Sequence, residues 1–197
     1  MESYNNTHFL SGDIGVSSDN SWLGKSLRFF ESMWTQRANV NHAFVFISPL
    51  FVIEALTKIT LSETSKYENR RVKIYRLSLT EKERFDLCVG LSEREDGAYG
   101  WDKYPLFFLD CVSTLVKRNI FRMKSPVFFF TKTFSISNIP VCSQLVVWGI
   151  HKFTSYRFKD NNGIEVSWKI VNPDYLDDLL TLPINNAILI CEEKEKT

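Results

Sequence analysis

The sequence has almost equal numbers of positive and negative charges, which gives it no general attraction for highly charged partners. Its 197 residues include 24 Lys and Arg against 23 Asp and Glu, a formal net charge of +1. A chain this close to neutral has no global electrostatic attraction for nucleic acid or for anionic membrane surfaces. We therefore predict no nucleic-acid partner, with RNA binding through a local basic patch left open.

Long apolar runs and a recognisable export signal are also absent from the sequence. The longest aromatic stretch, Val127–Phe130, is closed by Lys132 and falls far short of the ~20 residues that cross a bilayer. Residues 1–8 have neither the basic nor the apolar region of a secretory signal. These features predict a soluble, cytoplasmic protein without a membrane span.

The cysteines lack the spacing of a metal site. Cys88, Cys111, Cys142 and Cys191 form no CxxC pair, and the gaps between them are too wide and irregular for a zinc ribbon. Four cysteines are compatible with two disulfides, but disulfides are rare in proteins that are not exported. We therefore expect free thiols.

Helix and strand patterns alternate along a chain that contains no repeat and no linker. The pattern predicts strands over residues 11–16, 42–47, 51–56, 71–77 and 187–191. It predicts helices over residues 21–34, 80–91, 105–122, 138–148 and 172–179. Thr80 and Glu83 have the spacing of a capping box at the start of the second helix.

This order of elements predicts an α+β fold in a single domain over residues 1–197. The core is expected over about 11–191, followed by a solvated charged tail at 192–197. The runs 42–47 and 51–56 flank a Ser-Pro turn and read as a hairpin. Because both runs are apolar at most positions, we expect a sheet that is covered on both faces.

Cys142 is the strongest candidate for a reactive side chain. Pro140 favours the first turn of a helix, which places Cys142 near the helix N-terminus. The free N–H groups and the helix dipole there favour a thiolate and can hold an oxyanion. The alternative is a small buried apolar residue, as free cysteines often are. That reading fits Cys88 and Cys111 on apolar helix faces better.

A nucleophilic cysteine needs a base, and the chain offers three histidines. His8 lies in the polar N-terminal stretch, and His151 lies about two and a half turns from Cys142 along one helix. His42 opens an apolar strand and is the remaining candidate. The alternative is a histidine that is simply hydrogen-bonded at the end of a sheet.

Glu54 is the one charged residue in the second hairpin strand, where a carboxylate requires a partner. If Ser48–Leu50 form a three-residue loop, Phe44 opposes Glu54 and His42 lies diagonally on the same face. A loop of two or four residues would place Glu54 and His42 on opposite faces. The alternative is an edge position at which Glu54 points to water.

Four motifs in this order resemble the circularly permuted NlpC/P60 proteins, papain-like enzymes with bacterial, phage and poxvirus relatives. They are Gly12-Asp13-Ile14, His42 at the start of a strand, Val52-Ile53-Glu54-Ala55 and Cys142-Ser143-Gln144-Leu145-Val146. The resemblance spans Gly12 to about Leu179, with further matches at residues 75–77, 99–102 and 173–174. Gln144 departs from the glutamate that is often found there, and the insert at 17–41 is long.

The resemblance implies a permuted papain-like fold, with an antiparallel sheet packed against helices that include the cysteine-bearing one. It implies Cys142 as nucleophile, His42 as base and Glu54 as the third member, while Asp13 is structural. The chemistry would be attack on an amide or ester carbonyl of a peptide, amide or lipid substrate through an acyl-thioester, without metal or organic cofactor. The alternatives are a non-catalytic binding or virion-associated protein with this fold, or an unrelated α+β interaction module.

Overall fold

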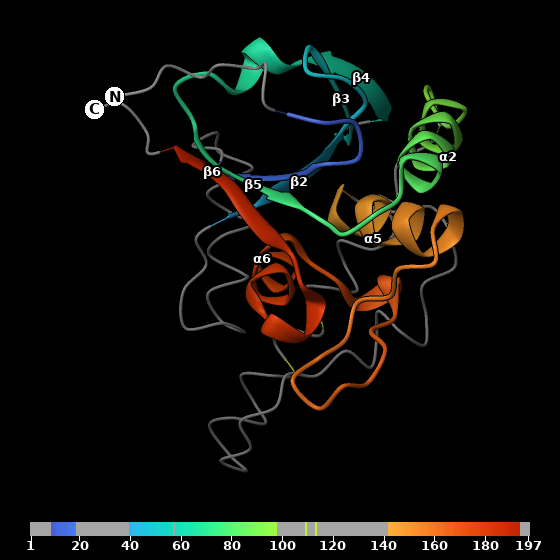
Figure 1. Cartoon of the computed structure of the whole chain (residues 1–197). Coiled ribbons are helices and arrows are strands. Elements are labelled where there is room, and N and C mark those ends of the chain that lie inside the picture. Colours follow the sequence, from blue (N-terminus) through green and yellow to red (C-terminus); the bar gives the residue numbers. More distant parts are fainter. Residues whose placement is uncertain are drawn as a thin grey trace.

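The structure is a computed structural model that describes residues 9–18, 40–56, 58–97, 109, 113 and 142–193. The helix predicted over 21–34, nearly all of the helix predicted over 105–122, and the loop at 99–102 lie outside the described residues. The same holds for His8 and Cys111. The described part contains one sheet and three α-helices (Figure 1).

The sheet has six strands in the order β4-β3-β2-β1-β5-β6, and every neighbouring pair is antiparallel. The strands are β1 (Ile14–Ser18), β2 (His42–Phe46), β3 (Phe51–Ala55), β4 (Ile59–Glu63), β5 (Arg71–Arg76) and β6 (Ile188–Glu193). The sheet with its helices confirms the predicted α+β class. Because β2 and β1 are the central strands, residues of β2 have neighbours on both sides.

The helices are α2 (Glu81–Ser92), α5 (Cys142–Phe153) and α6 (Pro173–Thr181), with 3-10 turns η2 (Thr64–Tyr67), η3 (Trp168–Ile170) and η4 (Pro183–Asn185). The predicted capping box begins α2: the Thr80 hydroxyl accepts from the Glu83 N–H, and the Glu83 carboxylate accepts from the Thr80 N–H. Asn172 caps α6 by accepting from the Tyr175 N–H.

Apolar side chains cover both faces of the sheet, as the two-sided pattern predicted. One cluster joins Ala43 and Val45 of β2 to residues of α2, α5 and α6, so the three helices pack on this face (Figure 1). The other contains Phe44 and Phe46 with Phe9 and Tyr67. Successive side chains of β2 therefore serve opposite layers, which follows from the two-residue period of a strand.

Several predicted boundaries were wrong. The first strand begins at Ile14 rather than at 11, because Gly12 adopts a φ of 83° in the preceding turn. The last strand runs to Glu193, so the predicted solvated tail at 192–197 begins too early: Glu192 and Glu193 pair with β5. The cysteine-bearing helix extends beyond 148 to Phe153. β4 and η2 were not predicted.

Candidate active site

His42 and Glu54 form a buried hydrogen-bonded pair on the β2–β3 hairpin. His42 Nε2 lies 2.6 Å from Glu54 Oε2, and the Glu54 side chain is fully buried. A buried carboxylate without partners would cost far more free energy than a stable fold can offset. The hydrogen bond to the imidazole is therefore one of the interactions that make this position tolerable for Glu54.

The hairpin register brings these two residues to one face. Phe44 pairs with Glu54, which is the pairing expected from a three-residue loop over Ser48–Leu50. The Ser48 hydroxyl accepts from the N–H groups of Leu50 and Phe51 and so closes this loop locally. The condition set by the sequence for a His42–Glu54 contact is thus confirmed.

Two further side chains donate to Glu54, and both come from η2. Lys66 Nζ lies 2.6 Å from Glu54 Oε1, and the Tyr67 hydroxyl lies 2.6 Å from Oε2. Ser62 of β4 also contributes a hydrogen bond to the carboxylate. The carboxylate is therefore surrounded by donors from three separate elements.

Cys142 reaches His42 from the other side of the sheet. It is the first residue of α5, which packs on the face of Ala43 and Val45. His42 is the first residue of β2, so its ring stands at the strand end, where the thiol can contact it. Because Nε2 faces Glu54, Nδ1 is the ring nitrogen left for the Cys142 side chain.

The start of α5 is fixed by two side-chain hydrogen bonds. Ser143 Oγ donates to the carbonyl of Val171 at 2.8 Å, and Gln144 Nε2 donates to the carbonyl of Lys169 at 2.8 Å. These bonds tie the first helical turn to the segment around η3. Gln144, the departure from the resembled family, therefore has a structural role here that holds Cys142 in place.

The electrostatics of the pair favour a charged imidazole. Burial by itself would lower the pKa of His42, but hydrogen bonds with Cys142 and Glu54 outweigh burial and raise that pKa to about 9. Burial would also raise the pKa of Glu54, but the His42 hydrogen bond and charge, followed by Lys66, bring it well below its usual value. Glu54 is thus a carboxylate beside an imidazolium at neutral pH.

Aromatic rings pack beside the His42–Glu54 pair. The Tyr67 and Phe44 rings have centroids 4.0 Å apart, and the Tyr67 ring is nearly parallel to the His42 ring, with 9° between their planes. Phe44 lies across Gly15 of β1, where an added Cβ would come within 2.1 Å of the ring. Gly15 is therefore required for the position of Phe44.

The other candidates from the sequence lie elsewhere. His151 lies on α5 with Cys142, as predicted, and its Nε2 accepts from the Phe158 N–H. Cys88 and Cys191 are free thiols, and burial raises the pKa of both, that of Cys88 to about 11. Asp13 is buried and accepts from Arg76, which fits its expected structural role.

Sequence reasoning missed Lys66 and Tyr67. Both lie in a 3-10 turn that no periodicity predicts, and their contacts with Glu54 depend on how β4 returns along β3. A weak signal was present, because a buried carboxylate at Glu54 requires several donors and histidine supplies one. That requirement does not say which residues supply the rest.

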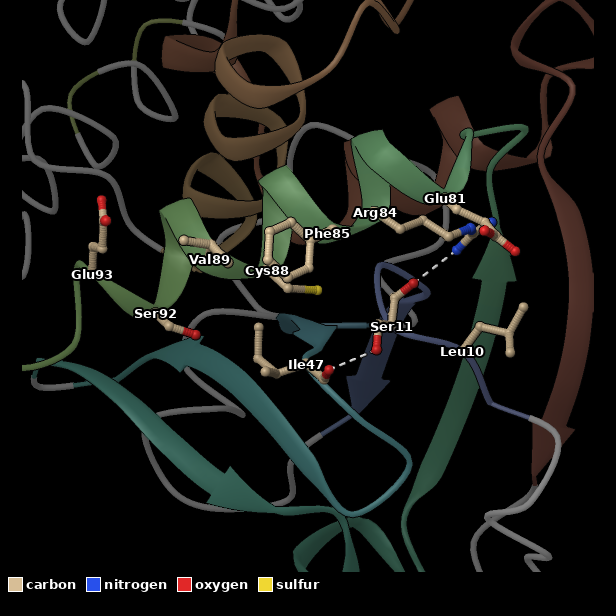
Figure 2. A pocket seen from close by; sticks show the side chains of 10 residues that line it. All are labelled: Leu10, Ser11, Ile47, Glu81, Arg84, Phe85, Cys88, Val89, Ser92 and Glu93. Atoms are coloured by element: carbon tan, nitrogen blue, oxygen red, sulfur yellow. Dashed lines mark hydrogen bonds between the residues drawn. The ribbon is translucent and has the colours of Figure 1, made fainter.

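A cavity of about 790 Å³ lies away from the pair, between α2 and the start of β1 (Figure 2). Its lining includes Phe85, Val89 and Leu10, which are exposed, together with Cys88. Arg84 points across it to the carbonyl of Ser11. None of Cys142, His42 and Glu54 lines this cavity.

Among the described residues, no group of three or more His, Cys, Asp or Glu side chains is arranged to hold a metal ion. Within the same part of the chain, no helix combines the length and apolar character needed to cross a membrane. No protein-family model matches the chain, and no curated protein matches it.

Proposed function

We propose that this protein is a thiol hydrolase or acyltransferase that attacks an amide or ester carbonyl with Cys142. The observation that carries the proposal is the buried row Cys142–His42–Glu54, in which a thiol at a helix start contacts an imidazole held at 2.6 Å by a carboxylate. A thiolate is far more nucleophilic than a thiol, and an adjacent imidazolium stabilises it.

The finer fold assignment is part of this proposal. We propose the permuted NlpC/P60 arrangement, in which the histidine strand precedes the cysteine helix. The supporting features are that β2 begins with His42, that α5 begins with Cys142, and that α5 packs against an antiparallel sheet. Free thiols at Cys88, Cys142 and Cys191 accord with the proposed cytoplasmic location.

The first half of the reaction transfers the acyl group to sulfur. In the proposed resting state the proton of the Cys142 thiol already lies on Nδ1 of His42, and the thiolate sulfur attacks the carbonyl carbon to form a C–S bond and an oxyanion. In this proposal, N–H groups in the first turn of α5 stabilise that oxyanion. When it collapses, the bond to the amine or alcohol breaks, and His42 returns the proton to this leaving group.

The second half releases the acyl group. Water, for a hydrolase, or an amine or alcohol, for an acyltransferase, gives its proton to His42 and attacks the thioester carbonyl. The C–S bond breaks, and the Cys142 thiolate is regenerated beside the imidazolium. Throughout both halves, Glu54 holds Nε2 of the ring and stabilises its positive charge.

Site-resolved alkylation with iodoacetamide tests the resting state of this site. An ordinary thiol with a pKa near 8.5 loses reactivity about two hundred-fold between pH 9 and pH 6. We expect Cys142 to keep most of its reactivity at pH 6 and to lose it in His42→Ala. Cys88 and Cys191, followed by mass spectrometry in the same sample, are internal controls. A Cys142 rate that falls with pH as an ordinary thiol does would overturn the proposal.

A further inference from the structure

Glu54 has more donors than the orientation of one imidazole requires. Oε2 accepts from both His42 Nε2 and the Tyr67 hydroxyl, while Oε1 accepts from Lys66 Nζ, each at 2.6 Å. The Glu54 side chain has no exposed surface, whereas the Lys66 side chain is 32% exposed. A cation therefore reaches in from the surface to a carboxylate that already has a partner.

The groups form a row in which the charges alternate. Lys66 is positive, Glu54 negative and His42 positive, with the Cys142 thiol at the end of the row. Around this row, Ser62 of β4 bonds to the carboxylate, and the guanidinium of Arg70 lies 5.7 Å from the centre of the Tyr67 ring.

When a carboxylate accepts hydrogen bonds from several donors, its interaction with each donor is weaker. A positive charge at Oε1 opposes the effect of Glu54 on the imidazolium, because the net charge that His42 faces is reduced. A hydroxyl at Oε2 competes for the oxygen that His42 uses. Both donors therefore weaken the hold of Glu54 on a protonated His42.

We propose that Lys66 and Tyr67 are positioning residues that act through Glu54 to limit how strongly His42 holds its proton. The inference rests on the proposed function, in which His42 must both keep a proton at rest and surrender it to a leaving group. Tyr67 has a second positioning role, because its ring lies parallel to that of His42 and stacks on Phe44.

The pKa of His42 should change in one direction in both variants. Removing either donor should make the imidazolium more stable and move the titration of His42 to higher pH. For Lys66→Met we expect a rise of about one pH unit, the order of a partly screened charge at this separation. For Tyr67→Phe, which keeps the ring, we expect a smaller rise in the same direction.

The titration is directly measurable by NMR on protein labelled with ¹⁵N-histidine, because the chain has three histidines. His42→Asn assigns the His42 signals. Lys66→Arg keeps the positive charge and should restore the wild-type midpoint, which separates a charge effect from a packing effect. A purely structural role would lower thermal stability in Lys66→Met and leave the midpoint where it is.

The chain also offers a matched control cluster. Lys73 and the Tyr75 hydroxyl donate to Asp177 in the same way, at 2.5 and 2.7 Å, on a carboxylate that belongs to α6. In Lys73→Met and Tyr75→Phe we expect an unchanged His42 midpoint. Equal shifts in these controls would mean that the midpoint follows general stability, and this would overturn the inference.

The outcomes separate this inference from the function on which it rests. If Cys142 alkylates as an ordinary thiol in the wild type, the proposed function fails, while the His42 midpoints still report on Lys66 and Tyr67. If Cys142 is reactive at pH 6 but both Lys66→Met and Tyr67→Phe leave the midpoint of His42 unchanged, the positioning role is wrong and the function stands.

Discussion

Two clusters in this protein share a lysine and a tyrosine that donate to one carboxylate, but the Glu54 carboxylate also bonds to a histidine. At Glu54, a lysine and a tyrosine donate to a carboxylate that also binds His42. At Asp177, a lysine and a tyrosine of β5 donate to a carboxylate of α6. The two lie on opposite faces of the sheet, because Tyr75 belongs to the helix-side core and Tyr67 to the other.

The Asp177 cluster shows what such a cluster does for structure alone. It attaches α6 to the sheet and satisfies a carboxylate that is nearly buried. The Glu54 cluster does the same for β3 and η2, and in addition its carboxylate, together with the Cys142 side chain, raises the pKa of His42. The proposed chemistry therefore depends on the histidine that joins the Glu54 cluster.

The largest difference is expected when each carboxylate is removed. Glu54→Ala leaves Lys66, Tyr67 and His42 without their common acceptor, and we expect a loss of about 3 kcal/mol in the free energy of unfolding. The low-pH reactivity of Cys142 should disappear with it. Asp177→Ala should also destabilise the protein, as measured by urea denaturation. It should leave the low-pH reactivity of Cys142 intact. Reactivity lost equally in both variants would erase the distinction.

The pH dependence of stability should reveal the Glu54 cluster and not the other. The pKa of His42 rises from 6.5 in the unfolded chain to about 9 in the fold, so its contribution is fully present below pH 6.5. That contribution, at most about 3 kcal/mol, is lost as the pH rises through 9. Urea denaturation between pH 6.5 and 9.5 measures it.

His42→Asn should flatten the stability profile over this range. Tyr75→Phe should leave the profile unchanged, because burial and Asp177 raise the pKa of Tyr75 far above the range. A wild-type stability that stays constant from pH 6.5 to 9.5 would contradict the assignment of a charged His42.

Gly15→Ala tests the aromatic support that distinguishes the Glu54 cluster. The new Cβ would overlap the Phe44 ring and push it toward Tyr67, and overpacking of this kind costs about 2 kcal/mol. We expect a lower melting temperature and a weaker low-pH reactivity of Cys142. A variant with wild-type values of both would show that the Phe44 ring moves aside without affecting the site.

The smallest effect is expected from Ser62→Ala. The Ser62 hydrogen bond lowers the pKa of Glu54 by less than those of His42 and Lys66 do. Its loss should cost about 0.5 kcal/mol in stability. The His42 midpoint, by NMR, should move to higher pH by less than in Lys66→Met. A larger shift in Ser62→Ala would reverse the proposed order of the donors.

Features encoded by local spacing were predictable from the sequence. The capping box at Thr80 and Glu83 and the Asn172 cap require only a fixed separation along the chain. The contact between His42 and Glu54 followed from the period of a strand and an odd loop length. Such features are set by backbone geometry that a few neighbouring residues determine.

Contacts between residues that are distant in the sequence were not predictable. Lys66 reaches Glu54 because β4 folds back along β3 and η2 then packs on the face of the sheet that carries Phe44, and no periodicity in residues 59–67 indicates that path. The extension of β6 to Glu193 likewise depends on pairing with Val72 and Lys73 rather than on its acidic residues. Partners distant in sequence decided both outcomes.

In the proposed mechanism, Cys142 takes up an acyl group with His42 as its base. The most direct test is incubation of the protein with a small activated ester at pH 6, followed by mass spectrometry that locates the acyl group on individual cysteines. We predict an acyl adduct on Cys142 that hydroxylamine removes, absent in His42→Ala and absent from Cys88 and Cys191 of the wild type. An adduct spread over Cys88, Cys142 and Cys191, or none on Cys142, would contradict the claim.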